Sequence, residues 1–99
     1  MAIMHNPAHP GRILRPYFAE MQVGEAAQKL GIARTTLSRV LNGKAGVSAD
    51  MALRISEATK TDATLWLDLQ SQYDLWQARS KKRTKVRPFA AVARNLQFG

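Results

Sequence analysis

A run of arginine, threonine and serine side chains is the part of this sequence best suited to recognition chemistry. Its members are Arg34, Thr35, Thr36, Ser38 and Arg39. Leu37, Val40 and Leu41 recur among them at helical spacing, so the polar side chains are expected to face outward from a helix. Arginine can bond guanine O6 and N7 in bidentate fashion, and a threonine methyl can pack on a thymine methyl. We therefore predict DNA base contacts from this set; the alternative for any one member is a solvated position.

Two polar residues after this run are suited to phosphate groups. Asn42 and Lys44 follow Leu41, where the helix is expected to end. Phosphate contacts fix the register of a protein on DNA without reading its sequence, and amides at helix N-termini can add to them. We predict phosphate contacts from both side chains.

The histidines and carboxylates do not form a catalytic or metal-binding set. His5 and His9 are four residues apart, but Pro7 and Pro10 forbid a continuous helix across them, and no glutamate lies between them. The sequence has no cysteine, and no paired carboxylates lie near a histidine. We therefore expect no metal, no cofactor and no enzymatic activity.

Most of the carboxylates follow the polar helix. Five lie between residues 50 and 78, against two basic residues: Asp50, Glu57, Asp62, Asp68 and Asp74. This stretch could complement a basic protein partner, although scattered acids on helices are more often simply solvated.

The net charge of +8 is unevenly distributed. Residues 79–99 hold seven basic residues and no acid, so the rest of the chain carries only +1. No apolar run approaches the roughly 18 residues of a membrane span, and the first residues lack the pattern of a signal peptide. We expect a cytoplasmic protein with a nucleic-acid partner and no membrane contact.

Two short helices meeting at Gly31 are predicted to position the polar run. The first should end near Leu30, and the second should run from Arg34 to Leu41. Gly31 suits a tight turn, because a residue without Cβ adopts positive φ at little cost. Ala27 permits close approach of the helices, and Gly43 is a typical residue after a helix end.

The flanking sequence predicts three further helices. The first covers residues 11–21, starting late or bending at Pro16, with this apolar stripe: Ile13, Leu14, Tyr17, Phe18 and Met21. The next begins after an N-cap at Ser48 and runs to Thr59 with these residues inward: Met51, Ala52, Ile55 and Ala58. The last begins after an N-cap at Asp62 and runs to Ala78.

The last helix has more apolar residues than one face can hold. Its main stripe comprises Leu65, Trp66, Leu69, Tyr73 and Trp76. Contacts with a second copy of the chain are predicted from Leu67, Tyr73, Leu75 and Trp76. The alternative is that residues 79–99 fold back over them, since a short docking helix is predicted at 89–97.

These elements predict an all-α protein with a basic tail. The expected parts are an N-terminal arm at 1–10, a helix-turn-helix and dimerisation domain at 11–78, and a solvated basic tail at 79–99.

Three longer segments of the sequence are distinctive: HPGRILR, EAAQKLGIARTTLSRVLNGKAGVSADMALRI and LWLDLQSQYDLWQAR. Together they resemble HigA-type antitoxins, which belong to the class of Cro-like and phage-repressor-like helix-turn-helix proteins. The resemblance covers roughly residues 9–79. It implies a five-helix domain that forms a homodimer and binds a palindromic operator on double-stranded DNA. It also implies neutralisation of a RelE-like ribonuclease toxin called HigB, for which the carboxylates at 50–74 are candidate contacts.

The sequence departs from the wider class at two helix starts. Gln22 stands where a Ser or Thr cap is usual, and Ala33 stands where a Ser would cap the recognition helix. Two alternative functions stay open: a stand-alone phage-type repressor without a toxin, and an RNA-binding module acting through the basic run from Lys81 to Arg87.

Overall fold

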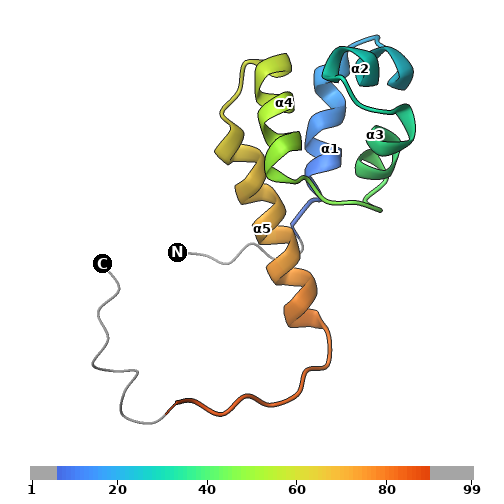
Figure 1. The fold of residues 1–99 in the computed structure, drawn as a ribbon. Helices are drawn as coiled ribbons and strands as arrows, with labels where there is room; N and C mark the ends of the chain where they lie inside the picture. The colour runs from blue at the N-terminus through green and yellow to red at the C-terminus, as the bar shows by residue number, and fades with distance from the viewer. Residues whose placement is uncertain (1–6, 90–99) are drawn as a thin grey trace.

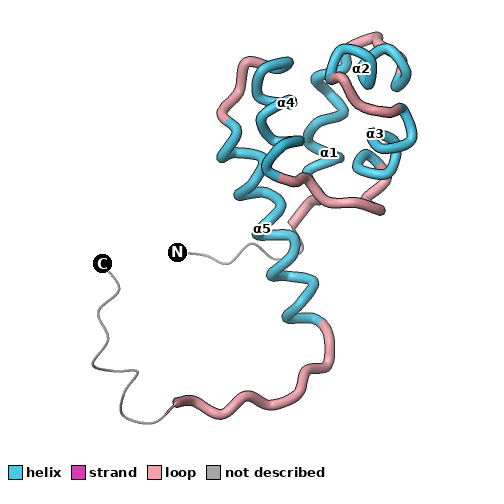
Figure 2. The backbone as a smooth tube through the Cα atoms, viewed as in Figure 1, coloured by secondary structure: helices cyan, strands magenta, loops and turns pink. Residues whose placement is uncertain are grey.

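The computed structural model describes residues 7–89, and this part of the chain is helical apart from its loops (Figure 1). Its elements are α1 (Pro10–Leu14), the 3-10 helix η1 (Arg15–Phe18), α2 (Val23–Leu30), α3 (Arg34–Leu41), α4 (Ala49–Thr59) and α5 (Ala63–Ser80). Helices α1 to α4 gather at one end of the molecule, and α5 extends away from them. Figure 2 shows only helices and loops in the described part, so the predicted all-α, five-helix fold is confirmed.

The core is built from one apolar face of each helix, together with Val47 of the loop after α3. Its buried members are Leu14, Phe18, Ala26, Ala27, Leu30, Leu37, Val40, Leu41, Val47, Met51, Ala52, Ile55 and Trp66. Trp66 is the buried residue of α5, and its Nε1 donates to Thr61 Oγ1 at 2.8 Å. The indole is therefore both desolvated and hydrogen-bonded, and it attaches the first half of α5 to the core.

The N-terminal helix is shorter than predicted. Helix α1 ends at Leu14, and the chain continues as η1 to Phe18 before Ala19 adopts a positive φ of 54°. Pro16 explains the change, because it has no amide hydrogen for an α-helical bond and its ring crowds the preceding turn. The predicted bend at Pro16 is therefore confirmed, and the prediction of helix over residues 11–21 was wrong beyond Phe18.

Only part of the predicted N-terminal stripe enters the core. Leu14 and Phe18 are buried, whereas Ile13 is 38% exposed and Tyr17 is 45% exposed. Tyr17 contacts Trp66 edge to face, with ring centroids 5.8 Å apart. The stripe therefore enters the core at Leu14 and Phe18 but not at Ile13 and Tyr17, because periodicity marks only a face that can be buried.

Helix α1 packs directly on the backbone of α3. A Cβ at Gly11 would meet the carbonyl oxygen of Val40 and would lie 2.9 Å from the Cα of Leu41. His9 caps α1, since its Nδ1 accepts from the Gly11 amide at 3.0 Å. Glycine at position 11 is therefore needed for this close approach.

The predicted starts of α4 and α5 are confirmed. Ser48 Oγ accepts from the Met51 amide at 3.2 Å, and Asp62 Oδ1 accepts from the Thr64 amide at 3.0 Å. Helix α4 ends at Thr59 as predicted, and α5 continues to Ser80. Ala58 was predicted to face inward but is exposed, since it lies at the rim of an apolar hollow rather than under a neighbouring helix.

The apolar residues of α5 are covered unequally. Leu65 belongs to the predicted main stripe but is 40% exposed, whereas Trp66 of the same stripe is buried. Leu67 packs partly buried against the core, and Leu75 is 51% exposed. Residues 81–89 are exposed and not helical, and the predicted docking helix at 89–97 lies outside the described residues apart from Phe89.

Candidate nucleic-acid interface

Helices α2 and α3 form the predicted helix-turn-helix. Gly31, between them, has a φ of 73°, a conformation that costs little without a Cβ. Helix α3 places Leu37, Val40 and Leu41 in the core, and Ala27 of α2 is 1% exposed. The small Ala27 side chain lets α2 approach α3, so α3 is held on the protein by its apolar side while its polar side is left outward.

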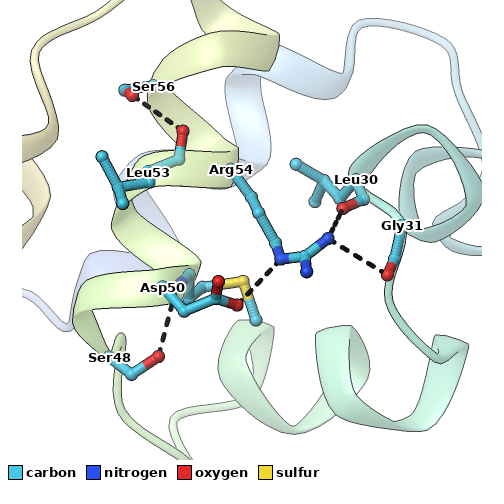
Figure 3. Close-up of polar contacts among 8 residues, drawn as sticks. Leu30, Gly31, Ser48, Asp50, Leu53, Arg54 and Ser56 are labelled. Carbon is cyan, nitrogen blue, oxygen red and sulfur yellow. Dashed lines mark hydrogen bonds and ion pairs between the residues drawn. The ribbon is translucent and has the colours of Figure 1, made fainter.

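Arg54 of α4 fixes the turn of this motif (Figure 3). Its Nη1 donates to the carbonyl oxygens of Leu30 at 2.9 Å and Gly31 at 3.3 Å, which satisfies open carbonyls at the end of α2. Its Nε donates to Asp50 Oδ2 at 2.8 Å, which orients the guanidinium. The four-residue spacing of Asp50 and Arg54 is visible in the sequence and favours their ion pair. No pattern near Arg54 in the sequence indicates its contact with α2.

The predicted base-contact residues lie together on α3. Thr35 and Arg39 are one helical turn apart and lie opposite the buried side of the helix. Arg34 and Thr36 flank them and are also exposed, while Ser38 is half-buried. The centre of the outer face is therefore formed by Thr35 and Arg39.

The end of α3 is bonded to the loop that follows it. Arg39 Nη2 donates to the Lys44 carbonyl at 3.1 Å, and the amides of Lys44 and Ala45 donate to the Arg39 carbonyl at 2.8 and 3.2 Å. Asn42 Nδ2 donates to Ser38 Oγ at 3.4 Å. The predicted phosphate contacts, Asn42 and Lys44, are exposed and adjoin the predicted base contacts.

Arg34 lies across the start of α2. A Cβ at Gly24 would be 3.7 Å from Arg34 Cδ and 3.9 Å from its Nε, so the arginine passes close to the first turn of that helix. Gln22 and Ala33, the N-cap residues of α2 and α3, form no side-chain capping bond. Positive charge and helix-start amides therefore lie near one another at this edge of the motif.

His9 is buried between α1, α5 and the loop after α3. It is 7% exposed, and its ring meets Tyr73 edge to face with centroids 4.8 Å apart. Burial lowers the pKa of His9, and this outweighs a hydrogen bond with the Ala45 backbone and the charge of Asp74. The ring is neutral at pH 7, so Nδ1 can accept from the Gly11 amide. This capping role was not anticipated from the sequence.

The candidate toxin-contact carboxylates are exposed and distributed over α4, α5 and the turn between them. Several have a structural role: Asp50 orients Arg54, and Asp74 Oδ1 accepts from Gln70 Nε2 at 2.9 Å. Bonds from the backbone and side chain of Thr64 lower the pKa of Asp62. These acids therefore do not form one patch of unengaged charge.

The candidate dimer-contact residues are not on one face. Leu67 turns toward the core, whereas Tyr73 and Trp76 lie beside each other with centroids 5.9 Å apart. These two rings, with His9, line a groove of about 440 Å³ that reaches the end of α3. Leu75 is exposed elsewhere on α5.

The chemistry of this surface is hydrogen bonding and charge. Within residues 7–89, no three acidic or histidine side chains come close enough to hold a metal ion. In the same range, no helix has the length and apolarity needed to cross a membrane. An exposed helix rich in donors, with arginines at both ends, is suited to the edges of DNA bases.

Known proteins are similar to this chain in sequence and in fold. A family model described as helix-turn-helix matches residues 19–66. The chain is 41% identical over 87 residues to virulence-associated protein A′ of Dichelobacter nodosus, across 85% of this chain and 76% of that protein. The antitoxin HigA of Pseudomonas aeruginosa, solved with the higBA promoter, is 35% identical, with a TM-score of 0.71 over 75% of this chain and 84% of that one. The chain belongs to the HigA-type antitoxin family.

A second solved structure is similar to this HigA-type chain over more of its length. Antitoxin GraA in complex with its operator is 37% identical, with a TM-score of 0.68 over 87% of this chain and 99% of that one. Family membership makes the chain a helix-turn-helix DNA-binding protein with an antitoxin and repressor role. The predicted resemblance is thus confirmed, and the individual base, phosphate, dimer and toxin contacts stay predictions.

Proposed function

We propose that this HigA-type chain is the antitoxin of a type II toxin–antitoxin pair. In this proposal it neutralises a RelE-like ribonuclease of the HigB kind and represses its own operon by binding a palindromic operator as a dimer. The observation that carries the DNA-binding part is the outer face of α3, where exposed Thr35 and Arg39 are held opposite a fully buried apolar side.

DNA recognition would use α3 in the major groove. Arg34, Thr35, Thr36, Ser38 and Arg39 would read bases, while Asn42 and Lys44 would contact phosphates. Two α3 helices related by a two-fold axis would enter successive major grooves about 34 to 36 Å apart. Occupation of the promoter would then repress transcription.

The dimer and toxin contacts would use other surfaces. Tyr73 and Trp76 are half-buried and Leu75 is exposed, which supports their candidacy for contacts between copies, with Leu67 contributing its exposed edge. Toxins of the RelE kind are basic, so Asp50, Glu57, Asp62, Asp68 and Asp74 are candidate contacts for the toxin. No catalytic step by the antitoxin is part of the proposal.

Co-expression with the neighbouring reading frame tests this function. The neighbouring protein alone should arrest growth, and co-expression of this chain should restore growth and yield a co-purifying complex. Growth that is unaffected by the neighbour would favour the stand-alone repressor instead. In parallel, a labelled duplex covering the region upstream of the gene should bind this protein more tightly than a scrambled duplex of the same composition.

A further inference from the structure

The loop between α3 and α4 is held from three directions. This α3–α4 loop comprises residues 42–48 and carries Lys44 near its centre. Arg39 bonds it from α3, through the Lys44 carbonyl at 3.1 Å. Because flexible segments lose backbone entropy when they bind, contacts that order this loop before DNA arrives would favour binding.

Gln70 of α5 makes the long-range bond to the loop. Its Oε1 accepts from the amide of Val47, a buried residue, at 2.7 Å. Its Nε2 donates to Asp74 Oδ1 at 2.9 Å. A carboxylate can only accept and an amide N–H can only donate, so this pair of partners fixes the orientation of the Gln70 amide.

The loop is shaped to receive this side chain. A Cβ at Gly46 would lie 3.1 Å from Gln70 Cδ and Nε2, closer than ordinary van der Waals contact. On the other side, His9 lies against the loop, with ring atoms 3.9 Å from the Cβ position of Gly43. The loop is therefore enclosed by α1 and α5 as well as by α3.

We propose that Gln70 is a positioning residue for DNA binding, which acts by holding the α3–α4 loop so that Lys44 meets a phosphate. The inference rests on the proposed function of the chain as an operator-binding repressor. Gln70 lies outside the helix-turn-helix, and both ends of its amide are bonded within the protein, to Val47 and Asp74, so a phosphate contact of its own is not the reason for its effect. It acts on DNA through the geometry of Lys44.

A set of variants measured at several salt concentrations tests this role. Operator affinity is measured by fluorescence anisotropy with the duplex from upstream of the gene. Gln70→Met should weaken binding about fivefold, the worth of about one hydrogen bond. It should also make the salt dependence shallower by up to about one unit per chain, as loss of one phosphate contact would. Lys44→Ala should produce the same change in slope.

The double variant identifies the route of the effect. If Gln70 acts through Lys44, then Gln70→Met should cost little further affinity in a Lys44→Ala background. Gln72→Met is the matched control, because Gln72 is exposed on the same helix and should leave affinity and slope unchanged. Thermal unfolding of every variant confirms that it is folded at the assay temperature.

A charge-neutral swap keeps the test valid if Gln70→Met unfolds. Gln70→Glu combined with Asp74→Asn retains an acceptor for the Val47 amide and reverses the bond along α5, so it should restore affinity that Gln70→Glu alone loses.

Suppose that the wild-type protein binds the operator specifically and that Gln70→Met has the same affinity and the same salt slope. This result would overturn the positioning role of Gln70 but leave the proposed function intact. Losses that are fully additive with those of Lys44→Ala would also overturn the positioning role. A wild-type protein that binds the upstream and scrambled duplexes equally would instead overturn the proposed function, and this inference with it.

Discussion

Arg39 combines a central place on the outer face of α3 with a bond to the α3–α4 loop. Replacing it with alanine removes a potential bidentate contact to guanine. We predict that Arg39→Ala weakens operator binding by about 1 to 3 kcal/mol and relaxes specificity at one base pair. Affinities for a panel of duplexes, each with one base pair changed, would measure both effects.

Lys44→Ala provides the comparison for Arg39, because a lost phosphate contact should weaken all sequences alike. Arg39→Ala also removes the bond to the Lys44 carbonyl, so part of its loss should be common to every duplex. If its loss were the same on specific and scrambled DNA, the assignment of Arg39 as a base reader would be wrong.

His9 makes stability depend on pH. Because burial lowers its pKa, the folded state binds fewer protons than the unfolded state just below the usual histidine pKa of about 6.5. Stability is therefore fully present above that pH and is lost as pH falls toward the lowered pKa. Protonation also removes the Nδ1 acceptor of the Gly11 amide.

Denaturant unfolding from pH 7.5 to 5 measures this dependence. His9→Asn keeps a capping acceptor but does not titrate in this range, so its stability should fall less between these pH values than that of the wild-type protein. Parallel curves for the two proteins would contradict the role of His9. Asp62, whose pKa is lowered by its bonds with Thr64, is present in both proteins and affects both alike.

At the scale of elements, Arg54 joins α4 to the turn between α2 and α3. We predict that Arg54→Ala destabilises the fold by about 1 kcal/mol, below the roughly 1.5 to 3 kcal/mol usual for bonds to a charged group, because its side chain is 40% exposed. For a domain of this size, the melting temperature should fall by about 4 to 8 °C. Differential scanning calorimetry would measure the change.

Lys29→Ala is the matched control for Arg54. It removes a second exposed ion pair at i, i+4, in which Lys29 Nζ lies 3.7 Å from Glu25 Oε2, but Lys29 has no side-chain bond to the turn between α2 and α3 in the described structure. Its effect should be within about 0.5 kcal/mol. Equal effects of the two substitutions would show that the contact with α2 adds nothing to stability.

Helix ends were predictable where a residue type dictates the local backbone. Ser48 and Asp62 cap α4 and α5 as predicted, and Gly31 has the positive φ that the turn requires. The outer face of α3 followed from the period of its apolar residues in the same way. These features depend on neighbours within about one helical turn.

Features that depend on distant segments could not be predicted. Ile13 and Tyr17 have the spacing of core residues, but their exposure depends on where α5 crosses α1. Arg54 and Gln70 read as ordinary polar positions, although each bonds a segment more than 20 residues away in the chain. Sequence periodicity indicates which side of a helix can be buried. Tertiary packing determines how much of that side is buried.

For the whole molecule, most of the net charge and the proposed base-reading face lie in different parts of the chain. The proposed base-reading face lies on α3, while residues 79–99 carry +7 of the net +8. In the described part of this tail, residues 81–89 are exposed and extend beyond α5 (Figure 1). A protein with this distribution can obtain specificity from one region and salt-dependent, sequence-independent affinity from another.

Truncation after Ser80 tests that division, since it removes residues 81–99 and leaves α5 complete. We predict that the truncated protein keeps its ratio of operator to scrambled-duplex affinity but shows a shallower salt dependence. Each phosphate neutralised by the tail contributes about 0.9 to the slope of log K against log salt. Anisotropy titrations at several salt concentrations measure both quantities.

An unchanged slope would mean that the tail is solvated when DNA is bound. Loss of operator preference would favour the alternative in which the basic run from Lys81 to Arg87, rather than α3, carries the nucleic-acid function.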